Sequence, residues 1–289
     1  MQCPTPLRIH PKRPIVPTKD WVPYFYVPCG KCPVCLQNKA NEWAFRLKQE
    51  LFVSKTSYFI TLTYDDEHLP RDDNGNPCFS KTHLQKMLKL LRYYNKKTTD
   101  AKIKYFINSE YGSKYCRPHY HCIIFNIADS IDKDELFSKI WPYGYVNFGT
   151  CNSKSIAYTT KYALKGTIIK DGRMLPIKLQ SKSLGISYIK EKGNFNKQNN
   201  AFYALDKQTK INLPRYYREK IFTEDERQQH FNQSTTEYAE RFRERVNQFS
   251  NDSNKSYYQR EVDFLNFQKE IKQQHYRDYI KKLKHKNKL

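Results

Sequence analysis

Long hydrophobic runs are absent from this 289-residue sequence. No segment approaches the roughly 20 consecutive apolar residues that a membrane-spanning helix needs. The first residues combine prolines and basic side chains with no apolar stretch behind them, so we do not expect a secretory signal peptide. We therefore expect no membrane partner, and we expect the eight cysteines to be reduced thiols or metal ligands rather than disulfides.

Motifs for nucleotide hydrolysis and for zinc proteolysis are also missing. Gly144 and Gly149 have the spacing of a phosphate-binding loop, but Thr150 stands where that loop requires lysine. The His-Glu-x-x-His pattern of zinc proteases does not occur. The sequence therefore lacks an obvious ATPase motif, and any ATP-driven step has to be supplied by another protein.

Acidic residues are scarce relative to basic ones. The sequence has 29 aspartates and glutamates against 51 lysines and arginines, which gives a formal net charge of +22. This excess predicts attraction to a polyanion, with an affinity that falls as salt is added. The 23 tyrosines and 17 phenylalanines favour single-stranded nucleic acid, whose bases stack on aromatic rings. A bias toward A/T-rich codons would also enrich tyrosine and lysine, and it stays open as an alternative.

Hydrophobic periodicity predicts a mixture of helices and strands. Strands are expected at residues 58–64, 103–108, 119–126 and 144–148. Helices are expected at residues 37–53, from Ser80 to about 94, from Asp132 or Asp134 to 141, at 155–164, and over much of 213–289. Residues 166–212 are polar, and their pattern places no element. We divide the chain into a Cys-rich N-terminal segment, a central domain and a basic helical C-terminal extension, at residues 1–36, 37–212 and 213–289.

The C-terminal extension has one apolar pattern and a strongly basic end. The pattern is a stripe at helical spacing that comprises Phe264, Phe267, Ile271, His275 and Tyr279. The last ten residues contain five lysines and no acidic residue. A solvated helical arm and a DNA clamp both fit this composition.

Two histidines flank a single residue in one expected strand. Residues i and i+2 of a strand point to the same face, so His119 and His121 can bind one ion from one side of a sheet. A hairpin with the preceding strand would bring the Glu110 carboxylate beside both imidazoles. Two imidazoles and a carboxylate suit Mg²⁺ or Mn²⁺ that also holds a phosphate oxygen, although zinc can occupy the same set. The alternative for Glu110 is a surface ion pair with Lys114 or Arg117.

A second motif supplies a candidate nucleophile. Tyr158 and Tyr162 are four residues apart and share one face of an expected helix, with Lys161 on a neighbouring face. A phenol has a pKa near about 10, so a nearby ammonium or metal would be needed to favour the phenolate. Attack on a phosphodiester would leave a phosphotyrosine and a free 3′-hydroxyl, which stores the bond energy for rejoining. In a chain with 23 tyrosines, an ordinary amphipathic helix gives the same pattern.

Together these motifs resemble the HUH endonucleases that initiate rolling-circle replication. The sequence is most similar to the replication initiators of small single-stranded-DNA phages, the microviruses and especially their gokushovirus branch. The resemblance rests on residues 29–46, 59–64, 110–121 and 158–165. It implies an α+β fold of the HUH/RRM-like kind, which is an antiparallel β-sheet with flanking helices. The histidines would lie on a central strand, and the tyrosine helix would pack beside the metal.

The resemblance also implies a reaction. One of Tyr158 and Tyr162 would nick the origin strand, forming a 5′-phosphotyrosine and a 3′-hydroxyl primer. The other would attack the regenerated origin, so that the displaced circle is released and closed. Lys161 would steady the phenolate or phosphate charge, and the divalent ion would polarise the scissile phosphate. The expected partners are single-stranded and origin DNA, a host helicase and a host DNA polymerase, in the cytoplasm of a bacterial host.

The cysteines leave a further possibility. Cys29, Cys32 and Cys35 are closely spaced, and Cys3 is the obvious fourth ligand for a structural zinc ion. An iron–sulfur cluster or a set of free surface thiols would also fit this spacing. Two other functional classes therefore stay open beside the replication initiator. They are a related HUH transposase or relaxase and a non-catalytic zinc-dependent DNA-binding protein.

Overall fold

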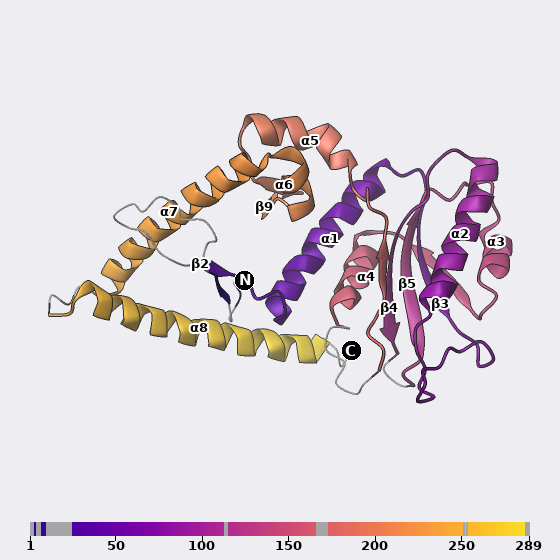
Figure 1. The fold of residues 1–289 in the computed structure, drawn as a ribbon, viewed down its shortest axis with the longest axis horizontal. Coiled ribbons are helices and arrows are strands. Elements are labelled where there is room, and N and C mark those ends of the chain that lie inside the picture. Colours follow the sequence, from indigo (N-terminus) through magenta and orange to yellow (C-terminus); the bar gives the residue numbers. More distant parts are fainter. Residues whose placement is uncertain are drawn as a thin grey trace. The chain divides into compact units, whose positions relative to one another are not determined.

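The computed structural model describes residues 3, 7–9, 25–112, 115–165, 173–250, 252 and 254–286. The chain forms two compact units (Figure 1). One unit comprises residues 37–214, and the other combines residues 1–36 with residues 215–289. No helix in the described ranges is both long and apolar enough to cross a membrane.

A five-stranded antiparallel sheet lies at the centre of residues 37–214. In spatial order its strands are β6 (Val146–Thr150), β3 (Ser57–Thr63), β5 (Pro118–Phe125), β4 (Lys104–Tyr111) and β7 (Lys178–Gln180). The predicted α+β class, with an antiparallel sheet and flanking helices, is confirmed. The central strand, β5, carries both histidines of the His-x-His motif.

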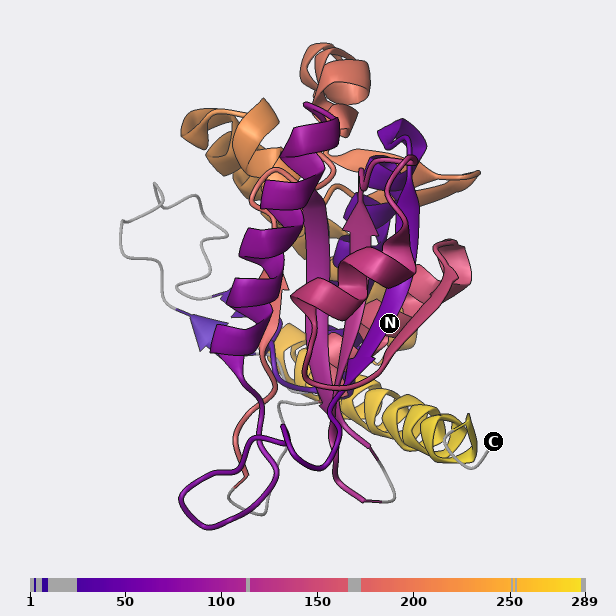
Figure 2. The ribbon, with the colours of Figure 1, turned by 90° about the vertical axis from the view of Figure 1, so that its right-hand side faces the viewer.

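Helices cover both faces of this sheet. One face packs against α2 (Lys81–Thr98) and α3 (Lys133–Ile140), which lie in front of the strands in Figure 2. The other face packs against α1 (Pro33–Val53) and α4 (Ser153–Lys165). The first core includes Ile60, Leu62, Tyr120, Cys122 and Ile124. The second core includes Leu47, Phe106, Ile123, Phe125 and Ile156. Because alternate residues of β5 enter alternate cores, both histidines face the side of α1 and α4.

Side-chain caps fix the starts of two helices. The Ser80 hydroxyl accepts a hydrogen bond from the backbone of His83, so α2 begins where the sequence predicted. Asp132, rather than Asp134, caps α3. The predicted end of α2 near residue 94 was wrong, because the helix continues to Thr98. The cause is Asn95, which is buried and bonds to the backbone of three residues outside the helix, namely Ala101, Asn126 and Ala128.

Regular structure also occurs in residues 166–212, where the sequence pattern placed none. The described part of this segment contains β7, α5 (Ser187–Gln198), β8 (Tyr203–Asp206) and β9 (Thr209–Asn212). The three strands are only three or four residues long. They are held by tertiary contacts, such as the Asn196 amide that donates to the carbonyls of Ala201 and Tyr203. Such contacts leave no periodic signal in the sequence.

The second unit consists of short strands and long helices. Its elements are β1 (Leu7–Ile9), β2 (Phe25–Val27), the first residues of α1, α6 (Arg215–Ile221), α7 (Glu224–Phe249) and α8 (Tyr257–Lys286). The helical character predicted for the C-terminal extension is therefore confirmed. Thr223 and Glu226 form a capping box at the start of α7.

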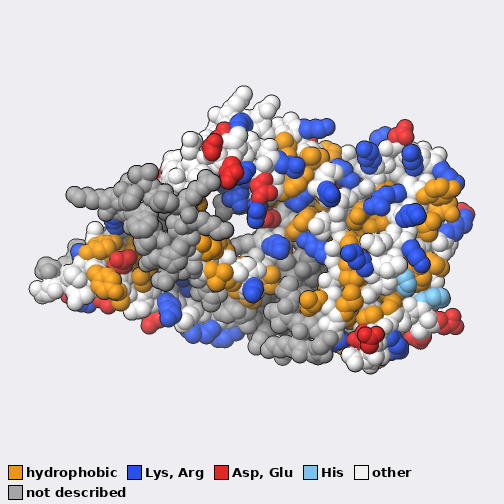
Figure 3. Space-filling view, in the orientation of Figure 1, with side chains coloured by type: hydrophobic (Ala, Val, Ile, Leu, Met, Phe, Trp, Pro, Cys, Tyr) orange, Lys and Arg blue, Asp and Glu red, His pale blue; other side chains and the backbone are white. Residues whose placement is uncertain are grey.

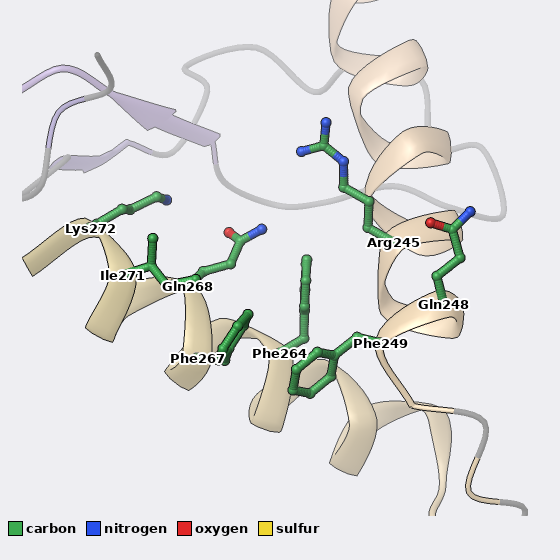
Figure 4. A pocket seen from close by; sticks show the side chains of 8 residues that line it. All are labelled: Arg245, Gln248, Phe249, Phe264, Phe267, Gln268, Ile271 and Lys272. Atoms are coloured by element: carbon green, nitrogen blue, oxygen red, sulfur yellow. The ribbon is translucent and has the colours of Figure 1, made fainter. Parts of the chain in front are cut away.

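The predicted apolar stripe of α8 is only partly buried. Phe264 is buried and packs between Phe242 and Phe249 of α7. Phe267 and Ile271 are 45% and 38% exposed, and they line a shallow pocket beside α7 (Figure 4). The helical spacing of the stripe identified the right residues, but α7 covers only its first turn.

Gly144 is the tightest glycine position in the described structure. Its φ is +148°, and a Cβ there would lie 2.4 Å from the Asp65 nitrogen and 2.6 Å from the Thr63 oxygen. We expect Gly144→Ala to lower the free energy of unfolding by about 3 kcal/mol or more, because backbone atoms would have to move. Gly75→Ala is the matched control, since Gly75 has a φ of +78° and open space around it. Urea unfolding would contradict this if both variants lost the same free energy.

Candidate active site

Strand register places the candidate metal ligands on one face of the sheet. Glu110 of β4 pairs directly with His119 of β5, and Asn108 pairs with His121. On the other side of β5, Thr61 of β3 pairs with His121. Directly opposed residues of antiparallel strands point to the same face. The hairpin that the sequence predicted therefore forms, and it brings the Glu110 carboxylate to the histidines.

The His121 imidazole is buried and held from several sides. Its Nε2 atom lies 3.3 Å from Oε2 of Glu110, and its Nδ1 atom lies 3.4 Å from the Thr61 hydroxyl. Its ring stacks on Phe59, with 5.9 Å between ring centroids. A carboxylate only accepts hydrogen bonds, so this arrangement places the proton on Nε2 and lets Nδ1 accept from Thr61. The orientation of the ring is thus fixed before any ligand arrives.

His119 is half-buried on the same face. Burial lowers the pKa of its imidazole, which favours the neutral form that binds metals. Its Nδ1 atom is buried and has no hydrogen-bond partner among the described residues. Its Nε2 atom lies toward Gly112, 3.0 Å from the point where a Cβ would stand. An unpartnered nitrogen at a buried position is consistent with a ligand that binds there.

The three candidate ligands are not equally close. Glu110 and His121 are at hydrogen-bond distance, whereas the His119 ring lies against Gly112. In the described ranges, the four cysteines are the one group of three or more such residues whose ligand atoms all lie within 4.8 Å. The donor chemistry of two imidazoles and a carboxylate still fits a divalent cation. Binding by all three would require the His119 ring to turn toward Glu110.

The ion pair considered as an alternative for Glu110 does not form with Arg117. Its guanidinium bonds instead to Asp66 and to the Tyr64 carbonyl. Lys114, the other partner considered, lies outside the described residues.

Helix α4 brings Tyr158 to the histidine face. The Tyr158 ring lies 5.2 Å from the His121 ring and 6.0 Å from the Phe59 ring, both in edge-on contacts. The side chain is 42% exposed, so a large substrate has access to it. The helix is anchored by a hydrogen bond from the Asn108 amide to the Thr159 carbonyl. The tyrosine that the sequence singled out is therefore a direct neighbour of a candidate metal ligand.

The other two candidates on α4 are less fully placed. Lys161 is partly buried, three residues after Tyr158. Tyr162 lies one turn after Tyr158 on the same helix, but its side chain is outside the described part of the structure. Three further residues shape the site without having been assigned a role from the sequence, namely Phe59, Thr61 and Asn108. Alternation along β3 and β4 places them on the histidine face, so their positions were readable once the sheet order was known.

Lys178 is a buried cation on this same face. It pairs with Asn108 in the register of β4 and β7, and its Nζ lies 4.0 Å above the Trp43 ring. Burial, and then the nearby Lys39 and Arg46, lowers the pKa of Lys178 to about 7. It belongs to the segment that the sequence pattern left unassigned. Half of its charge would be lost near neutral pH, so the folded protein carries a titrating group beside the site.

Lys178 makes the stability of the fold depend on pH. Its pKa is about 7 in the folded chain and 10.5 in a model peptide, so the unfolded chain binds more protons between these values. This group alone therefore makes stability rise with pH across that window, by up to about 1.4 kcal/mol per pH unit. We expect Lys178→Met to be more stable than the wild type at pH 7, with a gap that narrows toward pH 9. Urea unfolding at pH 7, 8 and 9 measures the gap. A constant gap, like that expected for the exposed control Lys81→Met, would contradict the assignment.

The surface around the sheet is basic. Figure 3 shows Lys and Arg side chains spread over the part of this face that holds the sheet and α2. With a formal net charge of +22, this distribution suits a polyanionic partner.

Comparison with known proteins identifies the relatives of this chain. The family model for the phage replication-associated protein ORF2 matches residues 57–167, which run from β3 through α4. Replication-associated protein ORF2 of Spiroplasma virus 4 is 33% identical over 219 residues, covering 69% of this chain and 68% of the relative. Replication-associated protein VP4 of Bdellovibrio phage phiMH2K is 30% identical over 216 residues, covering 68% and 67%. Replication-associated protein ORF4 of Chlamydia phage 1 is 26% identical over 188 residues, covering 57% and 46%.

No solved structure matches the chain. The resemblance to phage replication proteins that the motifs indicated is confirmed by these relatives. The chain belongs to the ORF2 family of phage replication-associated proteins.

Proposed function

We propose that this protein is a replication initiator of the HUH type, which nicks the origin strand of a small circular phage genome and later rejoins it. The observation that carries the proposal is the position of Tyr158, whose ring lies 5.2 Å from the His121 ring. His121 in turn lies 3.3 Å from the Glu110 carboxylate. A nucleophile, a candidate ligand pair and a basic surface thus meet in one unit of a replication protein.

The reaction begins with attack of the tyrosine oxygen on a backbone phosphorus. The bond from phosphorus to the tyrosine oxygen forms as the bond to the 3′-oxygen breaks. The phenolic proton is given up, and the 3′-oxygen takes a proton to become the free 3′-hydroxyl. One phosphodiester replaces another, so rejoining needs no ATP. Lys161, close to Tyr158 on α4, is the residue we assign to stabilise the developing negative charge.

His119, His121 and Glu110 are the residues that would hold a divalent cation, with Mg²⁺ or Mn²⁺ as the expected ion. When bound, such an ion would supply Lewis-acid polarisation of the scissile phosphate. The chain's own contribution is orientation. The Thr61 hydroxyl at His121 Nδ1 and the Phe59 ring keep the imidazole aimed at Glu110.

The second tyrosine and the partners complete the proposal. Tyr162 would perform the second attack, after one round of synthesis, so that the displaced strand is closed into a circle. A host helicase would unwind the duplex and a host polymerase would extend the 3′-hydroxyl, because the sequence has no phosphate-binding loop of its own.

A cleavage assay tests this function. Single-stranded oligonucleotides that tile the cognate genome are incubated with the purified protein and Mn²⁺ or Mg²⁺. We expect one oligonucleotide to be cut and to leave a protein–DNA adduct that survives denaturation, with no adduct in the presence of EDTA. Adding a second oligonucleotide with a free 3′-hydroxyl should release the DNA by strand transfer. Binding without any adduct, for every oligonucleotide, would favour the non-catalytic DNA-binding protein.

A further inference from the structure

Four cysteines that are far apart in the sequence meet in the second unit. Their sulfur atoms all lie within 4.8 Å of one another. The Cys3 and Cys32 sulfurs are 3.8 Å apart, and the Cys29 and Cys35 sulfurs are 4.0 Å apart. We propose that these four residues form a structural zinc site, which is separate from the proposed nicking centre.

The size of the cluster fits one ion. Four thiolates at about 2.3 Å from a tetrahedral zinc lie about 3.8 Å from one another. The two sulfur distances of 3.8 and 4.0 Å match this spacing. An iron–sulfur cluster has to fit several iron atoms and bridging sulfides between its ligands, and it would hold the cysteines farther apart. Since all four positions are protein ligands, none is left for water or substrate, as in structural rather than catalytic zinc sites.

Backbone amides point at the sulfurs. The Cys29 amide donates to the Cys3 sulfur at 3.4 Å, and the Cys32 amide donates to the Cys29 sulfur at 3.3 Å. The Cys35 amide donates to the Cys32 sulfur at 3.5 Å. Such bonds stabilise negative charge on sulfur, and thiolates are the form that binds zinc. The turn after Cys29 is made by Gly30, whose φ is +74°, a conformation that glycine adopts without strain.

The site would stabilise a region with little core of its own. Cys3 precedes β1, Cys29 follows β2, and Cys35 lies in the first turn of α1. The two strands have only three residues each, and Leu7 of β1 is 53% exposed. A hairpin this small buries too little apolar surface to be stable alone, and bound metal is a common substitute for a core. The ion would therefore tie both strands to the start of α1.

Metal analysis of the full-length protein tests the proposal. The protein is purified under reducing conditions and washed with excess Mg²⁺, and its zinc content is measured by mass spectrometry. We expect about one zinc ion per chain in the wild type and loss of that ion in Cys32→Ser and Cys3→Ser. Cys78→Ser is the matched control, because Cys78 is a free thiol outside the cluster. Cys32→Ser is also expected to melt about 5 °C or more below the wild type.

Two further measurements keep the result clear. Co²⁺ added to the metal-free wild type should give the absorption bands of a tetrahedral tetrathiolate site, whatever the stability of the variants. His121→Ala should keep its zinc, because the two sites share no residue, so failure of one proposal is separable from failure of the other. Bound iron with inorganic sulfide, a wild type that binds neither Zn²⁺ nor Co²⁺, or a Cys32→Ser variant with full zinc content would overturn the site.

Discussion

Changing both Tyr158 and Tyr162 to phenylalanine is expected to reduce covalent adduct formation and strand cleavage by at least about a thousandfold. The change removes both of the oxygen atoms that we propose as nucleophiles. The ring of residue 158 stays, and with it the packing against His121 and Phe59. We therefore expect the melting temperature and the affinity for single-stranded DNA to stay near wild type, the affinity within about twofold.

The assay separates chemistry from binding. Adduct formation is measured on a denaturing gel, and affinity is measured by titration with the same labelled oligonucleotide at a fixed salt concentration. The single variants Tyr158→Phe and Tyr162→Phe then report which tyrosine makes the first cut. Undiminished adduct formation in the double variant would show that neither residue is the nucleophile.

His121→Ala is expected to lower the rate of nicking by about a hundredfold or more. His121 contacts Glu110, Thr61, Phe59 and Tyr158 at once, so its loss removes a candidate ligand beside the nucleophile. Nicking is measured under single-turnover conditions over a range of Mn²⁺ concentrations. A ligand role predicts that the variant needs more metal for half-maximal activity, which a purely structural role would not produce.

Two controls belong with this variant. His68→Ala removes an exposed histidine that pairs with Asp65, outside the candidate site, and should leave nicking near wild type. His121→Gln keeps a polar side chain at the buried position, so it tests whether the alanine variant simply unfolds. Near-normal activity and metal dependence in a folded His121→Ala protein would remove this residue from the ligand set.

Local sequence patterns were enough to predict the centre of the fold. Alternation placed the two histidines on the opposite face from Tyr120 and Cys122, and the structure has these two in the core beneath α2 and α3. Ser80 was readable as a helix cap because the signal lies within four residues of sequence. These features depend on near neighbours, which is why periodicity and capping rules found them.

Features that depend on distant residues were not predictable in this way. The length of α2 is set by Asn95, whose partners lie on other elements. Lys178 enters the histidine face through β7, a strand of three residues. The proximity of Tyr158 to His121 was expected only from the family resemblance, since no spacing rule relates α4 to β5. The placement of the His119 ring against Gly112 had no sequence signal.

The most direct measurement is mass spectrometry of the peptide that carries DNA after reaction with the cleaved oligonucleotide. We predict a single modified peptide from α4, with a 5′-linked nucleotide on Tyr158 or Tyr162. A nucleotide attached to any residue outside α4, or a cleaved oligonucleotide with no attached peptide, would contradict the proposed mechanism.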